Sequence, residues 1–154
     1  MIWPFRRKSK KRMARLVIDE PITSSTRVSV IKALKQIEER EFPALILRID
    51  SPGGTVGDSQ EIYSAIKRLR DKGCKVVASF GNISASGGVY IGVASDKIVA
   101  NPGTITGSIG VIIRGNNLSE LLNKIGIKFE TVKSGVYKDI LSPDKPLSDE
   151  GREL

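Results

Sequence analysis

The sequence has no histidine, a single cysteine and few aromatic residues. Without an imidazole, a Ser/His/Asp triad is excluded, as is any mechanism that needs a histidine base. Cys74 has no partner for an internal disulfide, and we interpret it as a small core residue. Metal ligation would fall to carboxylates, which show no recognisable spacing, so we expect no metal and no other cofactor. One Trp, three Tyr and four Phe are too few to interleave with 25 Lys and Arg, which argues against nucleic-acid binding.

Positive charge is concentrated near the start of the chain. Seven Lys and Arg lie between Arg6 and Arg15, and they account for almost all of the net charge of +8. The apolar stretch before them, Met1–Phe5, is far shorter than the roughly 20 residues that span a bilayer. We therefore expect residues 1–15 to be a basic tail, either solvated or in contact with an anionic membrane surface. No transmembrane segment is expected, which predicts a cytoplasmic or membrane-peripheral location.

The remainder alternates short apolar runs with stretches of helical periodicity, a pattern typical of α/β folds. We expect residues 16–154 to form one domain, because a chain of 154 residues fits a single core. The last predicted helix begins at Ser148 and hardly starts before the sequence stops, so the domain is expected to be truncated at its C-terminal end. Strands are expected at 13–19, 44–49, 74–79, 97–101 and 128–132, and helices at 26–42, 59–70 and 118–125.

Two glycine-rich turns come after apolar runs. Asp50-Ser-Pro-Gly-Gly54 comes after the run 44–49, and Ser84-Ala-Ser-Gly-Gly88 comes after the run that begins at Cys74. A serine at the mouth of a helix lies beside unpaired N–H groups and a partial positive charge, which suit a developing oxyanion. Ser86 is therefore the candidate nucleophile. Taken alone, each turn is explained equally simply as an ordinary strand-to-helix connection.

Four motifs together resemble the signal peptide peptidase A family, the S49 Ser/Lys serine proteases with the ClpP/crotonase fold. These motifs occur in the family's order: RIDSPGG (48–54), SASGGVY (84–90), NPGTITGSIGV (101–111) and SGVYKDI (134–140). The resemblance implies an α/β ClpP/crotonase-like spiral of repeated strand-strand-helix units, assembled as a homo-oligomer. Many members carry an N-terminal transmembrane segment, which this sequence lacks.

The same resemblance implies the catalytic groups. Lys138 would take the proton from Ser86, and the amide of Gly87 would form the oxyanion hole with that of Gly53 or Gly54. A lysine is a base only when neutral, and an unperturbed pKa near 10.4 leaves about 0.1% neutral at pH 7.4. The catalytic lysine must therefore be desolvated, because burial lowers a lysine pKa.

We predict a serine endopeptidase that uses this Ser/Lys dyad to hydrolyse peptides, including cleaved signal peptides and other membrane-associated peptides. Two alternatives remain open. A crotonase-type acyl-CoA enzyme would use the same paired amides for a thioester enolate and would not need Ser86. A non-catalytic oligomeric module would need the glycine turns only for structure.

Overall fold

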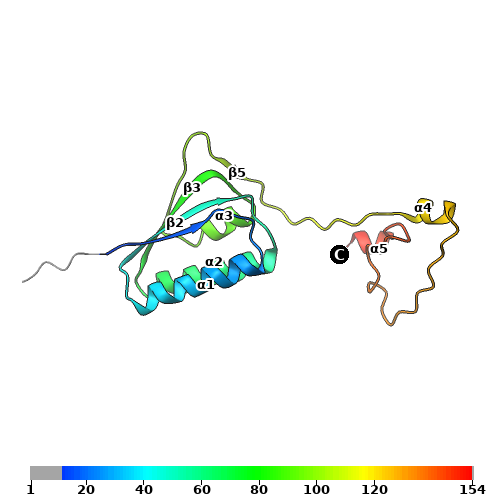
Figure 1. The fold of residues 1–154 in the computed structure, drawn as a ribbon, viewed down its shortest axis with the longest axis horizontal. Helices are drawn as coiled ribbons and strands as arrows, with labels where there is room; N and C mark the ends of the chain where they lie inside the picture. The colour runs from blue at the N-terminus through cyan, green and yellow to red at the C-terminus, as the bar shows by residue number, and fades with distance from the viewer. Residues whose placement is uncertain (1–11, 154) are drawn as a thin grey trace, which may run out of the picture. The chain divides into compact units, whose positions relative to one another are not determined.

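The computed structural model describes residues 12–153. The chain divides into two compact units, Met1–Gly110 and Val111–Leu154. Most of the predicted basic tail lies outside the described residues. The elements are β1 (Ala14–Ile18), α1 (Ser24–Glu39), β2 (Ala44–Ser51), α2 (Val56–Asp71), β3 (Lys75–Ala85), α3 (Gly87–Gly92), β4 (Lys97–Val99), β5 (Ile105–Gly107), α4 (Ser119–Lys124) and α5 (Asp149–Arg152) (Figure 1).

A parallel five-stranded sheet forms the frame of the first unit. Strands β1, β2 and β3 lie side by side, and the far side of β3 pairs with β4 along its first half and with β5 along its second half. Every pairing is parallel, so the carboxyl ends of β2 and β3 lie at the same edge of the sheet. The two glycine-rich turns follow these two strand ends, and the fold therefore brings them together.

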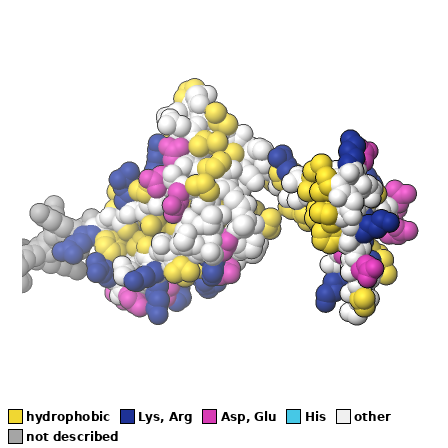
Figure 2. Space-filling model, turned by 45° about the vertical axis from the view of Figure 1, so that its right-hand side comes forward, with side chains coloured by type: hydrophobic (Ala, Val, Ile, Leu, Met, Phe, Trp, Pro, Cys, Tyr) yellow, Lys and Arg dark blue, Asp and Glu magenta, His cyan; other side chains and the backbone are white. Residues whose placement is uncertain are grey.

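One face of the sheet carries the hydrophobic core. Alternate residues of β2, Leu45, Leu47 and Ile49, are almost fully buried, as the period of two in a strand requires. The helices α1 and α2 run side by side beneath the sheet (Figure 1) and contribute apolar residues at helical spacing. Their buried hydrophobic residues are Val30, Leu34, Ile37, Ile62, Ala65, Ile66 and Leu69. Figure 2 shows charged side chains of both signs gathered along the lower side of this unit, where these helices lie.

The sequence predicted the first unit well, with one important difference. The strand expected at 74–79 continues to Ala85 as β3, because its second half gains a partner in β5. The glycine-rich run 102–110 supplies that partner. Residues 80–85 are therefore strand, and the strand ends only just before Ser86.

The second unit contains two short helices joined by extended segments and turns. Helix α4 lies within the predicted range 118–125, and α5 follows Ser148, whose hydroxyl accepts a hydrogen bond from the Gly151 N–H at 3.2 Å, as the predicted cap should. The strand expected at 128–132 is wrong. No strand forms between residues 111 and 153, so this segment has no edge to pair with, and Val132 is fully exposed. Among residues 12–153, no helix is both long and apolar enough to cross a bilayer.

Candidate active site

Ser86 lies at the point where β3 becomes α3. Its backbone has φ 51° and ψ −117°, outside the regions that side-chain-bearing residues prefer, at a cost of about 1–3 kcal/mol. Two backbone hydrogen bonds hold this conformation: the Ser86 N–H donates to the Gly107 carbonyl at 2.8 Å, and the Ser86 carbonyl accepts from Tyr90 N–H at 3.0 Å. The strained turn keeps Ser86 partly exposed between buried neighbours, Ala85 and Gly87.

The glycine pair of the first turn lies directly against this serine. A side-chain carbon placed on Gly53 would be 2.7 Å from the Gly87 nitrogen and 2.9 Å from Ser86 Cβ. Gly53 has φ +97°, which a glycine adopts without strain. The structure thus brings together four predicted site residues: Ser86, Gly87, Gly53 and Gly54.

Only some of the predicted oxyanion donors are free. The Gly53 N–H donates to Ser51 Oγ at 3.2 Å. Within residues 12–153, neither the Gly54 N–H nor the Gly87 N–H has a hydrogen-bond acceptor. A side-chain carbon on Gly87 would be 3.4 Å from the Gly54 nitrogen, so these two amides are close neighbours. Gly54 and Gly87 are therefore the two neighbouring glycines whose N–H groups have no acceptor among residues 12–153.

Ile22 fixes the position of Gly54, which the sequence did not reveal. The Ile22 N–H donates to the Gly53 carbonyl at 2.9 Å, and the Ile22 carbonyl accepts from Thr55 N–H at 3.0 Å. This parallel bridge uses the groups on either side of Gly54 and leaves the Gly54 N–H pointing away from Ile22. Ile22 itself is fully buried, which anchors the bridge in the core.

Helix α3 packs so closely that a side chain at its glycines would displace its neighbours. A side-chain carbon on Gly87 would be 2.5 Å from Ser59 Oγ, and one on Gly92 would be 2.6 Å from the ring of Phe80. Tyr90, one turn after Ser86, stacks on Tyr63 of α2 with ring centroids 4.9 Å apart. These contacts hold the helix that begins after Ser86 against both the sheet and α2.

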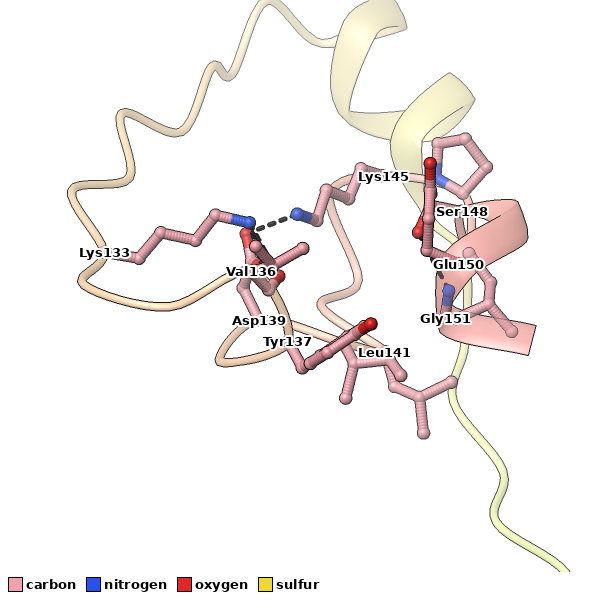
Figure 3. Close-up of a pocket in the computed structure, with 12 residues that line it drawn as sticks. Lys133, Val136, Tyr137, Asp139, Leu141, Lys145, Ser148, Glu150 and Gly151 are labelled. Carbon is pink, nitrogen blue, oxygen red and sulfur yellow. Dashed lines mark hydrogen bonds and ion pairs between the residues drawn. The ribbon is translucent and has the colours of Figure 1, made fainter. Parts of the chain in front are cut away.

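Lys138 belongs to the second unit, where it is exposed in the turn after Gly135. Figure 3 shows the surroundings of the adjacent residue, Asp139. The Asp139 carboxylate binds Lys133 Nζ at 2.7 Å and also pairs with Lys145. Hydrogen bonds from these lysines lower the pKa of Asp139 to about 2. The carboxylate next to Lys138 in sequence is thus engaged by two other lysines.

The described residues offer no obvious ligand set for a metal ion. Within 12–153, no group of three or more Cys, Asp or Glu is arranged to hold one. Cys74 is buried, and desolvation raises the pKa of its thiol, which disfavours the thiolate that metals and electrophiles need.

Comparison with known proteins identifies the family of this chain. The family model described as "Peptidase family S49" matches residues 68–154, and the model "Clp protease" matches residues 7–104. "Putative protease slr0021" of Synechocystis sp. is 60% identical over 154 residues, which are 100% of this chain and 55% of that protein. "Putative signal peptide peptidase SppA" of Enterococcus faecium is 43% identical over 123 residues, 79% of this chain and 36% of that protein. The chain thus spans about half or less of the length of these relatives.

Two solved structures of one protein, the "1510-N membrane-bound stomatin-specific protease", share the fold with a TM-score of 0.60. One carries a serine-to-alanine substitution, is 25% identical, and is matched over 70% of this chain and 52% of that chain. The other carries a lysine-to-alanine substitution with a bound substrate peptide, is 26% identical, and is matched over 70% of this chain and 49% of that chain. Together with the parallel sheet, they confirm the α/β fold of the ClpP/crotonase type that the motifs implied.

Proposed function

Because the chain belongs to peptidase family S49, we propose that it is the nucleophile-bearing part of a serine endopeptidase that cleaves peptides through an acyl-enzyme. The observation that carries this proposal is the strained Ser86, held beside two amides without acceptors, at Gly54 and Gly87. Such an arrangement suits attack on a carbonyl carbon, since a serine hydroxyl lies next to amides that could stabilise the resulting oxyanion.

The proposed reaction has two stages. Ser86 Oγ attacks the peptide carbonyl while its proton passes to Lys138 Nζ, and the negative oxygen is stabilised by the amides of Gly54 and Gly87. The C–N bond then breaks, the leaving amine takes the proton from Lys138, and an ester to Ser86 remains. Water, deprotonated by Lys138, attacks this ester. The C–O bond to Ser86 breaks, Lys138 returns the proton to Ser86 Oγ, and the acid is released.

Lys138 is assigned as the base on chemical grounds and on resemblance. The chain has no histidine, and Lys138 stands in the SGVYKDI motif of the family. The structural relatives were studied with a serine and with a lysine replaced by alanine, which fits a serine/lysine pair. The pairing of Lys133 and Lys145 with Asp139 also removes the nearest carboxylate in sequence as a competitor for the Lys138 amine. Lys138 would reach Ser86 from its own chain or from a second copy, and lose solvent there.

We propose cleaved signal peptides as substrates, because a relative is named a signal peptide peptidase and the structural neighbour binds a substrate peptide. We also propose a homo-oligomer. Its support is a run of apolar side chains that are exposed to solvent in the single chain and that contact with a second copy would bury. These residues, each 71–79% exposed, are Ile109, Val111, Ile112 and Ile113. Sedimentation equilibrium should give a mass of several chains, and a monomer at micromolar concentration would contradict the assembly.

Labelling with a fluorophosphonate probe, combined with peptide hydrolysis, tests the reaction. We expect the probe to modify Ser86, Ser86→Ala to abolish both signals, and Lys138→Ala to lower kcat by about 10²–10⁴-fold. The exposed residues Ser29 and Lys128 provide matched controls, and their alanine variants should behave as the unmodified protein. The rate should rise with pH as the lysine becomes neutral. Hydrolysis that persists in Ser86→Ala would rule out the proposal, and saturable acyl-CoA binding in that variant would favour a crotonase-type enzyme.

A further inference from the structure

The sheet is interrupted just before the nucleophile. Ile49 of β2 pairs with Phe80 of β3, but the next pair is Ser51 with Ser84. Between these pairs β2 has one residue, Asp50, and β3 has three, so β3 bulges outward opposite Asp50. A bulge of this size leaves backbone N–H groups without partners in the ladder, and these groups need another acceptor.

The carboxylate of Asp50 is that acceptor. Asp50 Oδ1 accepts the Ile83 N–H at 3.0 Å, and the backbone N–H of Asn82 also donates to this carboxylate. A side-chain carbon on Gly81 would be 2.7 Å from Asp50 Cβ, so the bulge closes tightly around Asp50 only because residue 81 is glycine. These backbone hydrogen bonds hold the pKa of Asp50 below its usual value, and Arg48, with Nη2 at 4.0 Å, contributes in the same direction.

The short strand segment after the bulge leads directly to the active site. Ser84, fully buried, donates to the Ile49 carbonyl at 2.7 Å, and residues 83–85 pair with β5. The next residue is Ser86, whose N–H binds Gly107. Since a slip of one residue turns a strand's side chains to the opposite face, the length of the bulge decides whether Ser86 lies beside the glycine pair.

We propose that Asp50 is a positioning residue, whose carboxylate fixes the β3 bulge and so places Ser86 Oγ against the Gly54 and Gly87 amides. This inference rests on the proposed function, because it assigns the carboxylate a purpose in the reaction of Ser86. Asp50 does not itself touch the substrate. It acts through Ile83 and the short strand segment that leads to the nucleophile.

Asp50→Asn is the informative variant. It nearly preserves shape, but an amide offers one acceptor oxygen and turns an NH₂ group toward the second backbone donor. Asp96→Asn is a matched control, because Asp96 also accepts a backbone N–H from β3, that of Val76 at 2.7 Å, but at the opposite end of the strand. The hydrogen bond from Val76 likewise lowers the pKa of Asp96, so the two carboxylates have similar electrostatic settings.

The test uses protein whose peptide hydrolysis is abolished by Ser86→Ala. In that protein, we expect Asp50→Asn to lower kcat and the rate of fluorophosphonate labelling at least tenfold, with KM changed less than threefold. Asp96→Asn should change neither rate more than twofold. A folded Asp50→Asn protein with normal kcat and labelling would overturn the inference and leave the proposed function intact. Activity that survives Ser86→Ala would instead remove the proposed function itself.

Amide NMR of the unmodified protein gives an answer that is independent of activity and of the folding of the variant. As the pH falls below 4 and Asp50 takes a proton, the N–H signals of Ile83 and Ser86 should shift with one common midpoint. The Val76 signal should follow Asp96 and serve as the internal reference. An Ile83 shift without a Ser86 shift would show that the bulge does not control the nucleophile, and would overturn the inference.

Discussion

Replacing Gly54 with alanine tests the architecture of the site most directly. The new Cβ would lie 2.6 Å from the Ile22 carbonyl carbon and 2.7 Å from the Ile22 nitrogen, and it would overlap the carbonyl oxygen. These neighbours are backbone atoms, so no side chain can rotate away. Ile22 or the turn must move, and the two hydrogen bonds that join Ile22 to Gly53 and Thr55 are lost.

The cost can be worked out from these contacts. Two net hydrogen bonds are worth about 1–3 kcal/mol together, and partial exposure of the fully buried Ile22 adds up to about 1.5–3 kcal/mol. The sum, about 2.5–6 kcal/mol, is a large part of the 5–15 kcal/mol that stabilises a typical domain. Because the displaced Gly54 N–H is a proposed oxyanion donor, kcat should also fall by about 10²–10³-fold in whatever fraction remains folded.

Gly57→Ala is the matched control, three residues further on. A side-chain carbon at Gly57 meets nothing within 4 Å, and the residue lies in the first turn of α2. Alanine there should stabilise the protein by about 0.4–1 kcal/mol and leave hydrolysis unchanged. Urea unfolding followed by circular dichroism, at constant m-value, measures both variants. A Gly54→Ala protein within about 0.5 kcal/mol of the unmodified one would refute the packing argument.

Two further predictions concern other parts of the chain. The pKa of Asp139, about 2, lies below its usual 3.8. Its ion pairs with Lys133 and Lys145 therefore stabilise the second unit above pH 4, and this stabilisation is lost as the pH falls from 4 to 2. Carboxyl carbon NMR should show the low titration midpoint of Asp139, and Lys145→Met should raise that midpoint. Gly92→Ala places a carbon 2.6 Å from the Phe80 ring and should cost about 1–3 kcal/mol by urea unfolding, whereas an unchanged midpoint would mean that α3 can shift freely.

Local patterns were sufficient to predict most elements of the first unit. The apolar alternation of β2 and the three- and four-residue spacing of α1 and α2 depend only on near neighbours in sequence. The glycine turns could be located for the same reason, as could the serine cap at Ser148, whose hydrogen bond reaches only three residues along the chain.

The sequence failed where structure depends on distant partners. The sequence of the second half of β3 predicts a loop, because Gly81 and Asn82 interrupt the apolar pattern. Pairing with β5, more than 20 residues later in the chain, makes this segment a strand. Which glycine of the pair offers a free N–H depends on a bridge to Ile22, more than 30 residues earlier. A glycine inside a strand pattern, such as Gly81, is the one local signal that could have indicated the bulge.

The chain divides at Gly110, so the proposed nucleophile, Ser86, and its proposed base, Lys138, lie in different units. Everything that shapes Ser86, from the Ile22 bridge to the Asp50 bulge and the Gly107 carbonyl, is complete within the first unit. On the proposed chemistry, Lys138 comes from the later part of the chain, so a nascent or unassembled polypeptide would carry a finished but idle hydroxyl. On this scheme, hydrolysis would begin only when Lys138 reaches Ser86.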